Sequence, residues 1–284
     1  MTRQSSPAKP AEDYLKQFSR ELRRKKRLVG DYSVQEWLER LRYVAAHDST
    51  GDRWRKRAGI GIVLFGFGSL FALAAPTAYL SGALFALFVG CIVLFFLLKS
   101  QDIPNRLRDS VLPLVTLLQQ DADPKAPLVL NVDLSGQEQP SKQIDQQTLS
   151  STYPKVKQAW FVDPWFQGSA TLRDGSVLRW NITDRVRRRL ITKRNARGKI
   201  KVKRKFKVKT RMDFSLSAKK GRYDLAPNAP SQPAKAHDSK WQLRNRHFTQ
   251  GREPDGQLEL GEFFAGVSVL FNSLKPVEKH HVGQ

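Results

Sequence analysis

A dense run of basic residues is the feature of this sequence best suited to chemistry. Residues 185–211 contain fifteen Lys and Arg and no Asp or Glu, a charge of +15 in a chain whose net charge is +23. Clustered ammonium and guanidinium groups bind phosphate and carboxylate groups. We therefore predict an anion-binding site formed by Arg185, Arg187, Arg188, Arg189, Lys199, Lys201, Lys203, Lys205, Lys207, Lys209 and Arg211.

The spacing of these residues predicts their secondary structure. Basic residues occupy every odd position of 199–211, and Ile200, Val202, Phe206 and Val208 occupy most of the even positions. Successive side chains of a β-strand point to opposite faces, so this alternation separates the two sets. We expect a strand over 200–216 with one buried face and one cationic face extending over roughly 40 Å.

Three interpretations of the cationic face are open. It could be a solvated face whose lysines discourage edge-to-edge aggregation. It could bind anionic phospholipid headgroups, which we favour because a membrane segment precedes it, or an acidic protein. It could instead bind nucleic acid, with aromatic residues as stacking platforms, and the candidates for that role are Trp160, Trp165, Trp180 and Phe206.

Catalytic chemistry has little support in the sequence. It lacks a glycine-rich phosphate loop, a nucleophile elbow, zinc-binding histidine spacing and kinase signatures. Asp163 precedes a proline and Asp174 fits a turn, which explains both without catalysis. A pocket gathering Asp163, Asp184 or His247 would indicate an enzyme. We expect a nonenzymatic protein without a cofactor or metal, and its one cysteine, Cys91, excludes an intramolecular disulfide.

The anion-binding segment follows an apolar region that predicts a membrane anchor. Residues 58–98 carry no charge, and one helix of that length would measure about 60 Å, twice the thickness of the hydrocarbon core. We predict a hairpin that turns near Pro76 and has spans at about 59–74 and 78–98. A buried hairpin of a globular protein is the alternative. Neither span contains an ionisable residue, which argues against a transporter.

The charges flanking the hairpin predict its orientation. Basic residues lie on both sides, and the positive-inside rule places both termini in the cytoplasm of a two-pass protein of the cell inner membrane. The residues concerned are Arg53, Arg55, Lys56 and Arg57 before the hairpin and Lys99, Arg106 and Arg108 after it.

Small residues recur along both spans at helical spacing. Such stripes allow helices to approach closely, so they predict either packing within the hairpin or a homo-oligomer. The residues that we assign to helix packing are Gly61, Gly68, Ala72, Gly82, Ala86 and Gly90.

The predicted organisation has three parts: a basic helical arm at 1–57, the hairpin at 58–98 and a cytoplasmic α+β domain at 99–284 with a linker near 226–236. A capping box formed by Ser33 and Glu36 begins the second helix of the arm. The domain is expected to be an antiparallel meander or small sandwich with a C-terminal helix at 260–274. Its expected strands are 128–134, 159–162, 166–172, 177–192, 200–216 and 241–248, with a loop at 135–151.

Overall fold

The computed structural model describes residues 9–72, 78–100, 102–229, 233–237, 239–252 and 256–277. The fold is α+β, with an antiparallel sheet and one long apolar helix. The chain divides into two compact units. The helical unit comprises Met1–Arg24 and Arg40–Ile103, and the sheet unit comprises Lys25–Glu39 and Pro104–Gln284.

The helical unit consists of α1 (Lys9–Lys25), most of α2 (Val34–Ala72) and α3 (Ala78–Ser100). The predicted capping box is confirmed: the Glu36 amide donates to Ser33 Oγ at 3.3 Å, and the Ser33 amide donates to Glu36 Oε2 at 3.0 Å. The predicted first span is not a separate helix, because its apolar residues continue α2 without a break. The turn expected at Pro76 lies outside the described residues.

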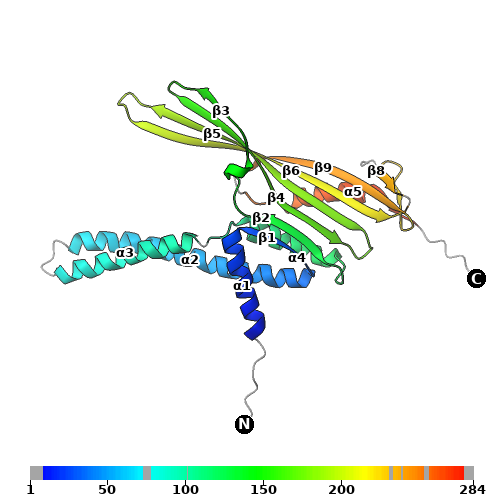
Figure 1. The fold of residues 1–284 in the computed structure, drawn as a ribbon, viewed down its shortest axis with the longest axis horizontal. Helices are drawn as coiled ribbons and strands as arrows, with labels where there is room; N and C mark the ends of the chain where they lie inside the picture. Colours follow the sequence, from blue (N-terminus) through cyan, green and yellow to red (C-terminus); the bar gives the residue numbers. More distant parts are fainter. Residues whose placement is uncertain are drawn as a thin grey trace, which may run out of the picture. The chain divides into compact units, whose positions relative to one another are not determined.

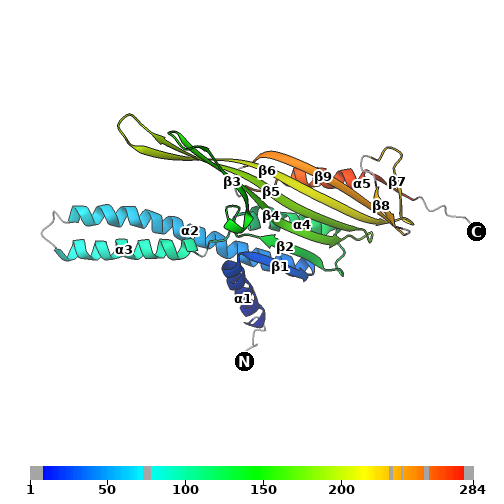
Figure 2. The same ribbon diagram turned by 45° about the horizontal axis from the view of Figure 1, so that its top comes forward.

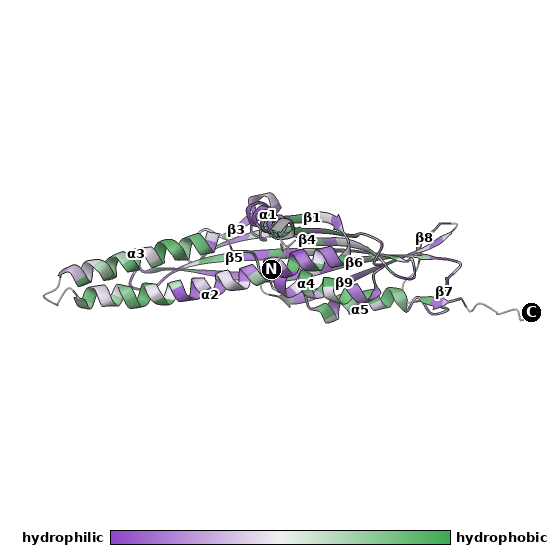
Figure 3. Ribbon diagram, turned by 90° about the horizontal axis from the view of Figure 1, so that it is seen from below, coloured by the Kyte–Doolittle hydropathy of each residue, from purple (hydrophilic) through white to green (hydrophobic). Residues whose placement is uncertain are grey.

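Within the described residues, Tyr79–Ser100 is the one helical segment that meets both the length and the hydropathy needed to cross a membrane. None of that segment is buried, and Figure 3 shows apolar residues along α3.

The small residues assigned to helix packing lie in different surroundings. A Cβ atom on Gly61 would lie 2.7 Å from Cys91 Sγ, and one on Gly68 would lie 3.6 Å from a methyl group of Leu84, so both face α3. Ala72 is buried. Gly82 and Gly90 have open space where a Cβ would be, and Ala86 is exposed. The two stripes therefore do not face each other.

The sheet unit is built on one antiparallel sheet with the strand order β1-β2-β4-β5-β6-β9-β8, and β3 pairs with β4 (Figure 1). A small second sheet pairs β7 with β10. The bounds are β1 Arg27–Tyr32, β2 Leu128–Asp133, β3 Gln143–Ser150, β4 Lys155–Thr171, β5 Val177–Arg194, β6 Ile200–Lys219, β7 Tyr223–Leu225, β8 Pro233–His237, β9 Lys240–Arg252 and β10 Leu274–Pro276.

Several strands differ from the expectations. β1 was not anticipated, and β3 lies in a segment predicted to be a loop. The two predicted strands at 159–172 form the single strand β4, whose register shifts between Pro164 and Phe166, so Trp165 is the extra residue of a bulge. β8 overlaps the end of the predicted linker, part of which is outside the described residues.

Helices cover one face of the sheet. A π-helical turn (Leu107–Val111) leads into α4 (Leu112–Asp121), and α5 (Leu260–Phe271) packs on β6 and β9, as Figure 2 shows for α5. Phe263 of α5 is fully buried, with its ring centroid 5.0 Å from that of Phe214 and 5.9 Å from that of Trp180. The expected C-terminal helix is thus present and covers the apolar face of the sheet.

The N-terminal part of the chain contributes to the core of the sheet unit. Trp37 is fully buried, and its indole Nε1 donates to the carbonyl oxygen of Leu128 at 2.7 Å. β1 pairs with β2 in full register. The sheet unit is therefore discontinuous in sequence, because residues on both sides of the apolar region build it.

Candidate functional site

The predicted anion-binding residues other than Lys199 lie on β5 and β6, toward the ends of these strands that are joined by the turn at 195–199. Here β3, β4, β5 and β6 continue past α4 and α5 as a narrow group of strands, which we call the blade and define as residues 143–161 and 186–208 (Figures 1 and 2). The register of β5 and β6 is unbroken from Val177↔Ser217 to Arg194↔Ile200. The two strands therefore hold their side chains in fixed rows.

The odd-numbered basic residues of both strands share one face. Register partners in an antiparallel pair point to the same side, and Arg185 lies opposite Lys209, Arg187 opposite Lys207 and Arg189 opposite Lys205. This is the face away from α5, because the even-numbered Trp180 and Phe214 contact Phe263. We call it the cationic face and assign to it Arg185, Arg187, Arg189, Lys193, Lys201, Lys203, Lys205, Lys207, Lys209 and Arg211.

Two of the predicted residues lie elsewhere. Arg188 belongs to the opposite face, where its guanidinium lies 5.1 Å from the centre of the Phe161 ring and pairs with Glu138 at 2.6 Å. Lys199 lies in the turn between β5 and β6, where its amide donates to Asn195 Oδ1 at 2.7 Å. The other predicted residues are brought together as expected from the alternation.

The opposite face of β6 is only partly buried, which corrects the expectation of a buried side along its length. Val208 is 1 % exposed and packs with Ala159, Phe161 and Val186, and Phe206 packs against this cluster. Ile200 and Val202 are 55 % and 59 % exposed. The physical reason is that the blade continues past α4 and α5, which cover this face elsewhere, and that β9 pairs with β6 only from Val208 onward in the described structure.

Most cations of the cationic face have no acidic partner in the described part of the chain. Arg211 pairs with Asp213 at 2.8 Å, and Arg189 donates to the amide oxygen of Gln158 at 2.5 Å. Among the described residues, Arg185, Arg187 and the lysines at 201, 203, 205, 207 and 209 form no ion pair. Like charges facing each other across a strand pair repel, so a bound anion would stabilise this arrangement.

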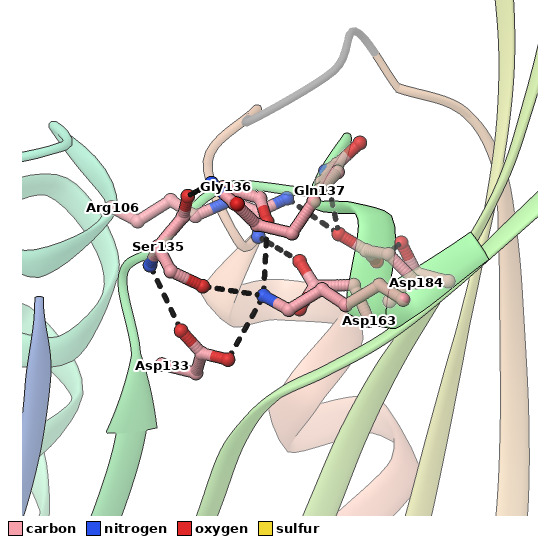
Figure 4. A network of polar contacts seen from close by, with 10 residues as sticks. Arg106, Asp133, Ser135, Gly136, Gln137, Asp163 and Asp184 are labelled. Atoms are coloured by element: carbon pink, nitrogen blue, oxygen red, sulfur yellow. Dashed lines mark hydrogen bonds and ion pairs between the residues drawn. The ribbon is translucent and has the colours of Figure 1, made fainter.

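A second polar cluster lies at the base of the blade and is buried. Asp163 of β4 lies opposite Asp184 of β5, which lies opposite Thr210 of β6. Arg106 is 3 % exposed and binds both carboxylates, with distances of 3.3 Å to Asp163 Oδ2 and 2.5 Å to Asp184 Oδ2 (Figure 4). Its guanidinium also stacks on the Trp165 ring, 4.5 Å from the centre.

Further partners complete this cluster. Lys142 Nζ lies 2.8 Å from Asp163 Oδ1 and 2.9 Å from Asp133 Oδ2. Asp184 accepts hydrogen bonds from Thr210 Oγ1 at 2.6 Å and from Gln137 Nε2 at 3.1 Å (Figure 4). The two carboxylates are thus held by fixed donors, which is the pattern of a structural cluster.

Burial, more than the surrounding charges, sets the titration of Asp163. Three carboxylates, those of Asp133, Asp163 and Asp184, face two cations, so one negative charge is not neutralised. Burial raises the pKa of Asp163, outweighing its hydrogen bond to Lys142 and its attraction to Lys142 and Arg106, and repulsion from Asp184 adds to the rise. Burial also favours a higher pKa for Asp133, but hydrogen bonds from Ser135 and Lys142 outweigh it and lower the pKa.

Sequence reasoning missed this cluster. It attributed Asp163 to the geometry before a proline, and it counted Arg106 among the membrane-flanking charges. The partners are 57 and 78 residues apart in the sequence, so no local pattern indicates them. The usable signal was limited to Asp184, which lies within the predicted strand 177–192 among residues expected to be buried, where a carboxylate requires a partner.

The other candidate groups do not form a catalytic or metal-binding cluster within the described residues. His247 bonds with Glu262 at 2.5 Å, on β9 and α5, and is not among the partners of Asp163 and Asp184. In the described part of the chain no group of three His, Cys, Asp or Glu side chains is arranged to hold a metal ion. The side chain of His237 and the terminal His280 and His281 lie outside the described residues.

The aromatic residues considered for base stacking are mostly in the core. Trp165 is fully buried and Trp180 is 3 % exposed. Phe206 is half-buried against the cluster of Phe161 and Val208. Trp160 is half-buried and lies opposite Arg187, on the cationic face. One of the four aromatic residues is therefore placed beside the predicted anion site.

Comparison with known proteins gave no match to a protein-family model, to a curated protein sequence or to a solved structure.

Proposed function

We propose that this protein is a nonenzymatic, membrane-anchored adaptor whose blade binds anionic phospholipid headgroups through its cationic face. The observation that carries the proposal is a row of cations on two adjacent strands without acidic partners among the described residues. Each Lys or Arg near an anionic membrane surface contributes about 1 kcal/mol of binding free energy, so such a row gives substantial affinity.

The membrane anchor is the second part of the proposal. The apolar window Tyr79–Ser100 supports one crossing, and the uncharged end of α2 would supply the other. The basic flanks would then place both termini in the cytoplasm, at the inner membrane. Two flanking cations are already engaged, because Arg106 is buried and Arg55 pairs with Asp52 and Asp102, which leaves Arg53, Lys56 and Arg57 as exposed flanking charges before the hairpin.

The test requires the full chain. A fragment beginning after the apolar region would lack β1 and Trp37, which belong to the sheet unit. The full chain would therefore be held in phosphatidylcholine nanodiscs and mixed with sedimenting vesicles of phosphatidylcholine alone or with phosphatidylserine. We expect binding to the anionic vesicles only, weakening as salt is added.

A matched pair of variants assigns the binding to the cationic face. Arg185→Gln with Arg187→Gln removes two cations from the cationic face, and Lys219→Gln with Lys240→Gln removes two exposed cations that face each other at the opposite end of the sheet. The first pair should weaken vesicle binding about tenfold or more, and the second should change it little. Equal binding to neutral and anionic vesicles would contradict the proposal.

Nucleic acid is the second candidate ligand, and the position of Trp160 beside Arg187 is the observation that favours it. In the same nanodiscs, a single-stranded RNA would then bind with a steep salt dependence, and Trp160→Ala would weaken it. No binding of RNA or DNA at low salt would remove this candidate.

A further inference from the structure

One edge of the sheet is open in the blade. Residues Ile200–Lys207 of β6 pair with β5 on one side, whereas β9 begins to pair on the other side at Val208. In the described structure these residues therefore have a neighbouring strand on one side only. About half of their backbone N–H and C=O groups point toward the open side, where a further strand could bind them.

Two other edge strands, β3 and β8, are interrupted, whereas the β6 edge, like the short β1 at the other end of the strand order, is regular. β3, at the opposite edge of the blade, has register shifts near Ile144 and Leu149. β8, at the end of the strand order, contains Pro233 and a register shift. Bulges and prolines are the usual devices that prevent strand addition. The β6 edge carries neither, since its register with β5 is continuous.

The side chains along this edge define what could pair with it. Lys201, Lys203, Lys205 and Lys207 project to the cationic face, and Ile200, Val202 and Phe206 project to the other face. In a sheet, residues opposite each other across a strand pair have Cβ atoms about 4.5–5.5 Å apart and interact directly. The complementary strand therefore places Glu or Asp on one face and aliphatic residues on the other.

We propose that the β6 edge of the blade, Ile200–Lys207, accepts an extended protein segment of alternating acidic and aliphatic residues by strand addition. Charge complementarity selects this partner. A second copy of the blade would place lysine opposite lysine, so the edge repels itself while remaining open to an acidic strand. The exposed side chains of Ile200 and Val202, which have cross-strand neighbours on β5, then gain neighbours on the open side as well.

This inference is independent of headgroup binding, because it concerns backbone pairing at an edge and not the face alone. It can be tested in neutral phosphatidylcholine nanodiscs, where no anionic lipid is present. The probe is a fluorescent peptide of alternating Glu and Val residues, long enough to pair with Ile200–Lys207. One control peptide has the same composition with its Glu residues in one block, and another has alternate backbone nitrogens methylated.

The expected result is that the alternating peptide binds at least about tenfold more tightly than either control, because a strand needs both the register of charges and its backbone hydrogen bonds. Amide hydrogen exchange at Ile200–Lys207 should slow when the peptide is bound. Equal binding of all three peptides, or binding without amide protection, would show attraction by charge alone and overturn the proposal. Absence of binding by the alternating peptide would also overturn it.

Protein variants locate the site. Val202→Ser should weaken peptide binding about twofold to fivefold, and Val29→Ser is its matched control, since Val29 of β1 is 60 % exposed and Val202 is 59 % exposed. Arg185→Gln with Arg187→Gln should weaken vesicle binding and leave peptide binding nearly unchanged, because both residues lie on β5, one strand away from the edge. If Val29→Ser weakened peptide binding as much as Val202→Ser, the β6 edge would be excluded as the binding site.

Discussion

β4, β5 and β6 carry charged residues in two regions, the buried cluster at the base of the blade and the cationic face. The charges are paired in the first region and mostly unpaired, among the described residues, in the second. At the base, Arg106 and Lys142 neutralise aspartates within a buried cluster. In the blade, lysines and arginines line one face with few acidic partners among the described residues. The base therefore uses charge to hold strands together, whereas the blade places like charges side by side at some cost in stability.

Breaking the base should have the largest effect on stability. Arg106→Met would leave Asp163 and Asp184 buried without their shared cation, which should lower the free energy of unfolding by about 3–5 kcal/mol. Denaturant unfolding of the full chain, followed by tryptophan fluorescence, measures the change. Arg108→Met is the control, because Arg108 is partly exposed and pairs with the adjacent Asp109. If Arg106→Met and Arg108→Met lowered the free energy of unfolding equally, the cluster would not be structural.

Close packing near the base should give the next largest effect. A Cβ on Gly168 of β4 would lie 2.2 Å from the Trp180 ring, so Gly168→Ala should lower the free energy of unfolding by about 1–3 kcal/mol. Gly221→Ala, where a Cβ meets nothing within 4 Å, should have little effect. If the two variants unfold alike, the base is less tightly packed than the structure indicates.

The titration of Asp163 predicts a pH dependence. The raised folded-state pKa means that this group favours folding most at pH values below its ordinary pKa of 3.8, and the contribution is lost as the pH rises through the folded-state pKa. Asp163→Asn cannot ionise, so its stability relative to the native protein should improve as the pH rises from about 4 to 7. Melting temperatures measured across this range test the prediction.

Asp174 supplies a control of opposite sign. Burial favours a higher pKa for Asp174, but hydrogen bonds from Ser176 and Tyr223 outweigh it and lower the pKa. Its stabilisation is therefore present above pH 3.8 and lost as the pH falls through its folded-state pKa. Asp174→Asn should accordingly lose stability relative to the native protein as the pH rises from about 3 to 5. If the relative stabilities of the two variants changed with pH in the same direction, the opposite pKa shifts assigned to Asp163 and Asp174 would be contradicted.

The smallest effect is expected in the blade. Lys203→Gln with Lys205→Gln removes repulsion between exposed cations, so the melting temperature should rise slightly, on the order of 1 °C. Lys142→Gln at the base should instead lower it, because Lys142 is held by Asp133 and Asp163. A drop of similar size in both variants would remove the contrast between blade and base.

Local patterns predicted much of the secondary structure. The Ser33 and Glu36 capping box, the Asp174-Gly175 turn and the alternation along β6 each depend on neighbouring residues, and all are present. β3 was missed because its sequence is mostly polar, and β1 was missed because it is short and contains Arg27, Gly30 and Asp31. Both acquire strand structure by pairing, β3 with β4 and β1 with β2. The boundary drawn between the arm and the hairpin does not interrupt α2, because charged and apolar residues are equally compatible with one continuous helix.

The features of the candidate site also separate into those predicted from local sequence and those that depend on the tertiary structure. The sequence by itself determined that the lysines of β6 share a face, since the period of a strand is a local property. Only the tertiary structure decided that the arginines of β5 join them, that the outer edge of β6 is open in the described structure, and that Arg106 binds Asp163 and Asp184. These features depend on strand register and on contacts between residues far apart in the chain, and neither is encoded in the spacing of nearby residues.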